Sequence, residues 1–198
     1  MTILGVLPLV LLLARHGDPL PEGAPAPRIE ALSHDGRAFG ADFEGRITLV
    51  DFFATWCPHC RDSLAGHDRL MAAFGDRVRL VIVDVEEDPA LVRAFFARRR
   101  PPAGAELYFD RSGLTSRLWK VTGFPTLYLV DRAGVIRYAT SGYDDGEVPY
   151  LAKLITDLEN GDRPAGRSRK RGRAGAATTV TFTSEDARAR AMGVEIIH

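Results

Sequence analysis

The apolar positions between residues 27 and 160 follow two different periods. Short, nearly continuous apolar runs predict buried strands at 46–54, 78–85, 106–110, 126–131 and 135–142. Apolar residues three or four positions apart, together with the boundary signals around them, predict helices at 57–74, 89–100, 113–121 and 148–160. Strands that alternate with helices and end in a strand pair and a last helix predict an α/β domain whose sheet is covered on both faces.

The two ends of the chain lack this pattern. Residues 3–14 are apolar throughout, which suits the core of a secretory signal or a short anchor and falls below the roughly 20 residues of a membrane-spanning helix. A buried N-terminal helix is the alternative. Residues 17–27 contain four prolines and predict a linker. We therefore expect a signal or anchor segment with a linker at 1–26, a domain at 27–160, and a basic, largely disordered tail at 161–198.

Composition excludes several classes of protein. The chain has 198 residues, of which 45% are apolar and 26% charged, so one globular domain is expected rather than a disordered or wholly membrane-embedded chain. The formal net charge is zero, and we expect the basic residues between 163 and 173 to form a solvated tail rather than a nucleic-acid site. Two cysteines in a chain this long are too few for a disulfide framework and indicate a working pair.

Both cysteines lie in the stretch Cys57-Pro58-His59-Cys60, directly after a predicted strand and at the start of a predicted helix. Unpaired N–H groups and aligned peptide dipoles at a helix N-terminus favour negative charge, so the Cys57 thiolate is expected to be stabilised there and to act as the nucleophile. Cys60 lies one turn further along the helix and can attack a mixed disulfide formed at Cys57. It is therefore the predicted resolving thiol.

Two other interpretations of the cysteines are weaker. A zinc site usually needs four ligands, and the histidines at 16, 34, 59, 67 and 198 show no ligand spacing, so we expect no metal site. Two unrelated buried thiols would rarely fall at this spacing. We assign His34 and His67 to ordinary surface positions.

Asp51 lies within a strand flanked heavily by apolar residues, where an unpaired carboxylate is costly. We expect it to retain a proton more readily than an exposed aspartate and to move the proton of Cys60 during exchange; a side chain that points to solvent is the alternative. Asp84 and Asp131 also follow apolar runs, but near predicted strand ends, where we expect surface acids.

His59 bears on the direction of the reaction. A histidine at the helix start adds hydrogen-bond donors or positive charge beside the Cys57 thiolate, which stabilises the reduced protein and makes the disulfide more oxidising. A thiol shift from about 7 to about 3.5 is worth on the order of 100 mV, most of the gap between reducing and oxidising dithiol proteins. The alternative is a solvent-facing helix residue without such a role.

The stretch VDFFATWCPHC resembles the active-site segment of the thioredoxin superfamily, and GFPTLYLVD at 123–131 resembles that superfamily's cis-proline loop. The interval between Cys57 and Pro125 admits an extra β-α unit, ELYFDRSGLTSRLWKV, as in the TlpA/ResA/DsbE-like branch of exported thiol-disulfide oxidoreductases. The opening PAPRIEALSHDGRAF is similar to the N-terminal hairpin of that branch, with a turn at Asp35-Gly36. The Glu-x-Pro that often follows the second cysteine in this branch is absent.

The resemblance implies a thioredoxin-like fold: a central mixed sheet flanked by helices, with an N-terminal β-hairpin and the β-α insertion before the cis-proline loop. It implies a cis peptide before Pro125, with Phe124 and Thr126 beside it in a backbone segment that pairs with an extended substrate. Trp56 would flank the thiols as an apolar contact surface, unless it packs in the core. Asp51 matches the position of the superfamily's buried acid.

The expected function is thiol-disulfide exchange with cysteines of partner proteins through Cys57, in a monomer that is exported or tethered facing the periplasm or exterior. The dithiol carries the electrons, so no bound cofactor is expected, and a redox partner protein would restore its starting state. Two alternatives remain open: a peroxiredoxin-like peroxidase, and a non-enzymatic module that uses the two thiols as soft ligands for copper.

Overall fold

A mixed β-sheet organises the computed structural model, which describes residues 18–33, 36, 38, 43, 45–85 and 88–161. Within these residues the strand order is β1-β4-β3-β2-β5-β6. The strands are β1 (Leu32–Ser33), β2 (Ile47–Phe53), β3 (Val78–Val85), β4 (Glu106–Asp110), β5 (Thr126–Val130) and β6 (Ile136–Ser141). β2, β3 and β4 run parallel, whereas β5 is antiparallel to β2, β6 to β5, and β1 to β4.

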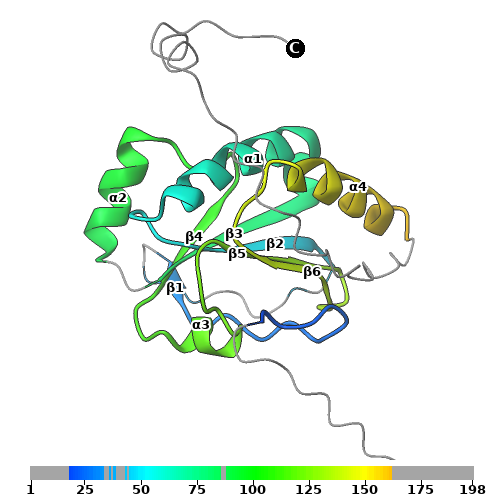
Figure 1. The fold of residues 1–198 in the computed structure, drawn as a ribbon, viewed down its shortest axis with the longest axis horizontal. Helices are drawn as coiled ribbons and strands as arrows, with labels where there is room; N and C mark the ends of the chain where they lie inside the picture. The colour runs from blue at the N-terminus through cyan, green and yellow to red at the C-terminus, as the bar shows by residue number, and fades with distance from the viewer. Residues whose placement is uncertain are drawn as a thin grey trace, which may run out of the picture. The chain divides into compact units, whose positions relative to one another are not determined.

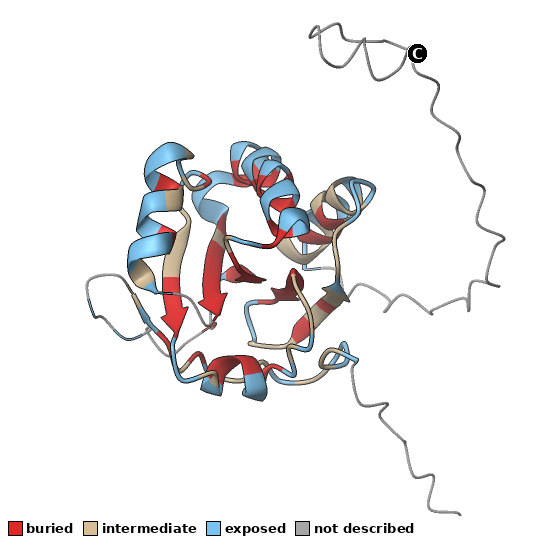
Figure 2. Ribbon diagram, turned by 60° about the vertical axis from the view of Figure 1, so that its left-hand side comes forward, coloured by how far each residue is buried: buried red, intermediate tan, exposed pale blue. Residues whose placement is uncertain are grey.

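The helices cover both faces of this sheet. They are α1 (Pro58–Phe74), α2 (Pro89–Arg98), α3 (Leu114–Leu118) and α4 (Glu147–Glu159), with a short 3₁₀ turn at Gly75–Arg77 after α1. α1, α2 and α4 lie on one side of the sheet and α3 on the other (Figure 1). The central strands β2, β3 and β5 and the inward faces of the helices are buried, while the outward helix faces are exposed (Figure 2).

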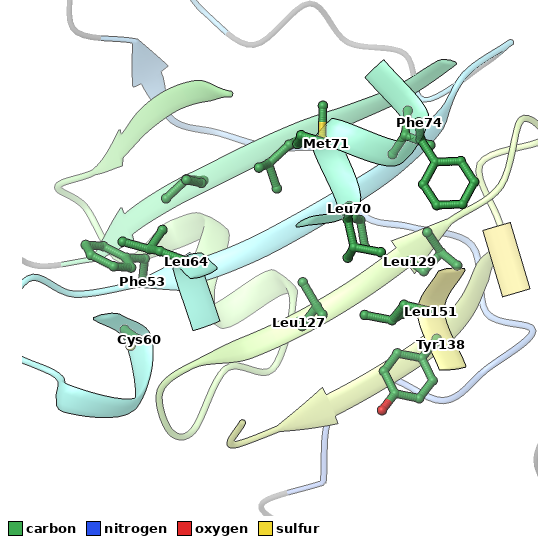
Figure 3. Close-up of a cluster of buried hydrophobic side chains, with 14 of the residues drawn as sticks. Phe53, Cys60, Leu64, Leu70, Met71, Phe74, Leu127, Leu129, Tyr138 and Leu151 are labelled. Carbon is green, nitrogen blue, oxygen red and sulfur yellow. The ribbon is translucent and has the colours of Figure 1, made fainter. Parts of the chain in front are cut away.

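Alternation along β2 divides the core into two layers. Leu49 and Phe53 pack with α1, α2 and α4, whereas Val50 and Phe52 pack on the opposite face with Trp119. Figure 3 shows the first layer, in which side chains of α1 and α4 meet those of the strands. Since both faces are covered, the central strands read as continuous apolar runs.

The predicted fold class is confirmed, including the β-α insertion, which is β4 followed by α3. α3 is shorter than predicted because the backbone leaves the helix at Trp119 and Lys120 has a positive φ of 52°. The predicted N-terminal hairpin is described only in part: β1 pairs with β4, an isolated bridge joins Leu32 to Ala38, and Asp35 lies outside the described residues.

The predicted signal or anchor at 3–14 and almost all of the predicted tail also lie outside the described residues. In the part of the chain that is described, no helix is both long enough and apolar enough to cross a membrane.

Close packing of α1 against the start of α4 depends on Gly66. A Cβ at this position would lie 2.8 Å from Cγ2 of Val148 and 3.0 Å from the hydroxyl of Tyr143. An alanine in a helix interior normally gains about 1 kcal/mol over glycine, but overpacking a close contact costs about 1–3 kcal/mol. We expect Gly66→Ala to lower the free energy of unfolding by roughly 1 kcal/mol, measured by urea denaturation.

Ala72 on the same helix is exposed and provides the control. Ala72→Gly is expected to lose about 1 kcal/mol from helix propensity alone. A Gly66→Ala protein more stable than the parent would show that the two helices have room to separate.

Candidate active site

The first turn of α1 presents the two cysteines. Cys57 is the N-cap residue, with extended backbone angles (φ −79°, ψ 116°), and Pro58 occupies the first helical position, where no N–H is needed. The backbone N–H of Cys60 donates a hydrogen bond to Sγ of Cys57 at 3.2 Å. Both residues are free thiols. An amide that points at the sulfur at the positive end of a helix favours negative charge on Cys57.

Cys60 lies deeper than Cys57: its exposed fraction is 0%, against 4% for Cys57. It packs at the start of α1 near Leu64 and Phe53 (Figure 3). Burial raises the pKa of the Cys60 thiol well above its ordinary value, and the hydrogen bond with Cys57 and the nearby Asp51 carboxyl add to this shift, while the Ala54 backbone opposes it. Cys60 therefore holds its proton firmly, and a resolving thiol of this kind needs a group that removes it.

Asp51 is fully buried on β2 and faces α1. Its Oδ2 lies 2.8 Å from Nε2 of His67 on α1, and its Oδ1 has no hydrogen-bond partner among the described residues. The alternative in which Asp51 points to solvent is therefore wrong. The assignment of His67 to the surface is also wrong, because only 3% of this residue is exposed.

A sequence signal for His67 was present in the helical period of α1. The buried positions Cys60, Leu64, His67, Met71 and Phe74 recur every three or four residues on one face. A histidine is by residue type expected at the surface, whereas its position on this helix face predicts burial.

Asp84 and Asp131 are likewise buried, contrary to expectation. Asp131 accepts hydrogen bonds from the backbone N–H groups of Ala133 and Val135 in the β5–β6 turn.

The second motif lies next to the first. The Phe124–Pro125 peptide is cis, as the resemblance implied. The Phe124 ring meets the Trp56 ring edge-on, with centroids 5.8 Å apart, so the residues before Cys57 and before Pro125 are in contact. Trp56 is 63% exposed, which rules out core packing and leaves an apolar surface beside the thiols.

The remaining predicted residues differ in their surroundings. Thr126 is buried, and its hydroxyl donates to the carbonyl of Gly123 at 2.7 Å, so this side chain braces the loop. The carbonyl of Pro125 accepts a hydrogen bond from the backbone N–H of Gly142.

The His59 side chain is 72% exposed, and its Nδ1 lies 3.9 Å from Oδ2 of Asp62. Across the described ranges, no group of three or more His, Cys, Asp or Glu side chains is arranged to hold a metal ion.

Taken together, the sheet order, the Cys-x-x-Cys at the N-terminus of α1 and the adjoining cis-proline loop define a dithiol protein of the thioredoxin-like class. Residues 23–139 match the AhpC/TSA family, and the chain belongs to this family. The thioredoxin superfamily resemblance is confirmed.

The relatives agree with this assignment. The chain is 32% identical over 124 residues to the thiol:disulfide interchange protein DsbE of Escherichia coli, covering 61% of this chain and 65% of that protein. It is 32% identical over 120 residues to HelX of Rhodobacter capsulatus, another thiol:disulfide interchange protein, covering 60% and 66% of the two chains. The crystal structure of a putative DsbE from Chlorobium tepidum superposes with a TM-score of 0.64 at 28% identity, over 70% of this chain and 98% of that one. The chain thus spans just under two thirds of the length of these two curated relatives.

Proposed function

We propose that this protein is a thiol-disulfide oxidoreductase that exchanges disulfides with cysteines of partner proteins. The observation that carries the proposal is the pairing of Cys57, an N-cap thiol that accepts the Cys60 amide, with a fully buried second thiol one turn further along α1. The names of the relatives, thiol:disulfide interchange proteins, support the same chemistry.

The reaction can be followed bond by bond in the reducing direction. The Cys57 thiolate attacks one sulfur of a partner disulfide, forms a mixed disulfide and releases the first partner thiolate. Cys60 then loses its proton and attacks Sγ of Cys57, which forms the Cys57–Cys60 disulfide and releases the second partner thiolate. Two electrons pass from the dithiol to the partner, and the released thiolates take up protons. The oxidising direction reverses these steps, and neither direction requires a bound cofactor.

The proposal includes a site of action outside the cytoplasm. The apolar run at 3–14 and the proline-rich segment that follows support an exported or tethered protein. A second protein of opposite redox poise would reset the dithiol after each turnover.

Reduction of insulin by dithiothreitol tests the function directly. The purified protein is expected to accelerate insulin precipitation over dithiothreitol alone, and equilibration with glutathione buffers gives the direction. A reduction potential near −120 mV would indicate an oxidant and one near −270 mV a reductant. Peroxide-dependent turnover without insulin reduction would contradict the proposal and favour a peroxidase.

Trp56 is expected to contribute to partner binding and little to stability. Trp56→Ala should change the free energy of unfolding by about 0.5 kcal/mol or less, because the side chain is mostly exposed. The rate with insulin should fall severalfold, while the rate with a small disulfide such as dithiobis(nitrobenzoate) should stay unchanged. Leu32→Ala is the control, since Leu32 is 53% exposed on β1, with β4 and β3 between it and β2. Equal losses with both substrates would show that Trp56 acts on the thiols instead.

A further inference from the structure

Apolar packing does not explain why Asp51 and His67 form a buried polar pair. Both side chains are almost inaccessible, 1% exposed for Asp51 and 4% for His67, and they form a polar contact of 2.8 Å beside a cluster of buried apolar side chains. Replacing such a pair by apolar residues is often neutral or stabilising, so a buried pair is weak evidence for a stabilising role. Its position beneath a dithiol site suggests a chemical one.

Asp51 is linked both to His67 and to the resolving thiol. Cys60 and His67 are seven residues apart on one face of α1, which corresponds to about 10 Å along the helix axis. Asp51 faces this stretch from β2, contacts His67 and acts electrostatically on Cys60. One carboxylate oxygen is held by the imidazole, and Oδ1, without a hydrogen-bond partner among the described residues, is the oxygen left to take up a proton.

The other ionisable groups around the pair come from β6, from α4 and from the turn between these two elements. Glu147 at the start of α4 is half-buried and accepts a hydrogen bond from the Tyr138 hydroxyl on β6 at 2.5 Å. Burial raises the pKa of Glu147; Tyr138 and His67 oppose this shift, while Asp51 and Asp144 add to it. His67 is thus the basic side chain among these acidic groups, and it opposes the shift of the Glu147 pKa.

We propose that His67 is a positioning residue that keeps Asp51 ionised and thereby sets the rate at which Cys60 gives up its proton. This inference rests on the proposed function. The imidazolium of His67 holds the Asp51 carboxylate, and the Cys60 proton moves to Asp51. The positive charge of His67 then balances the Cys60 thiolate until that thiolate attacks Cys57. The partner leaves as a thiolate, and Asp51 releases the proton to solvent.

Dithiobis(nitrobenzoate) separates the two steps in the reduced protein. The first equivalent of thionitrobenzoate reports attack by Cys57, and the second reports attack by Cys60 on the mixed disulfide. His67→Gln keeps a side-chain amide that can donate to Asp51 but cannot carry charge. Without the cation, the buried Asp51 carboxylate loses its charge partner, and an unpaired buried carboxylate is costly.

The second release in His67→Gln is therefore expected to rise with pH at least about one unit later than in the parent, and to be about tenfold slower at pH 7. The first release should change less than twofold. Asp68→Asn is the matched control, because Asp68 is the next residue on α1, is exposed and pairs with Arg99; its two steps should match the parent. Coincident pH profiles in His67→Gln and the parent would overturn the proposal.

If His67→Gln does not fold, a measurement on the unaltered protein still tests the proposal. The ¹⁵N signals of the His67 ring in the reduced protein are expected to show both nitrogens protonated at pH 7. A neutral ring would overturn the role given to His67.

The outcomes separate this inference from the proposed function. If the first release or insulin reduction is missing in the parent, the proposed function fails. If both are present and only the pH shift in His67→Gln is missing, only the role of His67 fails.

Discussion

Cys60→Ser is expected to stop the reaction at the mixed disulfide, whereas Cys57→Ser should lose exchange almost completely. In the first variant the N-cap thiol is intact and captures a partner, but no second sulfur is present to release it. In the second variant the remaining thiol is Cys60, which is fully buried and whose pKa is raised by that burial. We expect its reaction with dithiobis(nitrobenzoate) at pH 7 to be at least about 100-fold slower than that of the parent.

Mass spectrometry and absorbance give the two readouts. Cys60→Ser should release one equivalent of thionitrobenzoate and retain one on Cys57, while the parent should release two and retain none. The same variant should accumulate covalent complexes with partner proteins. A Cys57→Ser protein that exchanges disulfides as fast as the parent would remove the basis of the proposed mechanism.

Asp51→Asn is expected to slow the second step by about 100-fold at pH 7, the lower end of what a positioned proton acceptor contributes. The first step should be unaffected, because the hydrogen bond to Sγ of Cys57 comes from the Cys60 backbone. Asparagine has nearly the same shape and can still accept a hydrogen bond from His67, so the variant should fold. Stopped-flow measurement of the two thionitrobenzoate releases separates the steps.

Asp131→Asn provides a matched control. Asp131 is also a buried aspartate, but it directly follows Val130, the last residue of β5, at the end of the strand opposite Thr126, and it pairs with Arg137 at 2.6 Å. Its loss should affect stability and leave the second step unchanged. An Asp51→Asn protein that resolves mixed disulfides at the parent's rate would show that Cys60 gives its proton to another acceptor.

Much of the fold could be predicted because the period of apolar residues is a local property. The run 78–85 coincides with β3, and the helix predicted after Cys57 coincides with α1 and its N-cap. The insertion was predicted from the family resemblance, because the interval between the two motifs is wide enough to admit an extra β-α unit. α3 was predicted too long because a positive φ at Lys120 is not written in the hydrophobic pattern.

The residues around Asp51 show where sequence reasoning stops. A buried acid in β2 could be inferred from its apolar flanks, but its partner could not, because His67 lies 16 residues away on another element. The exposure of Trp56 was equally open, since an aromatic residue beside an apolar run suits both a core and a binding surface.

By itself the sequence determined the order of strands and helices, the placement of two thiols in the first turn of a helix, and the presence of an acid in the strand before them. These follow from spacing along the chain. Tertiary structure alone decided that Cys60 is sealed from solvent, that Trp56 is not, and that an imidazole meets the Asp51 carboxylate. Burial and charge pairing depend on which elements pack together, and that packing is settled by the whole core rather than by neighbours in sequence.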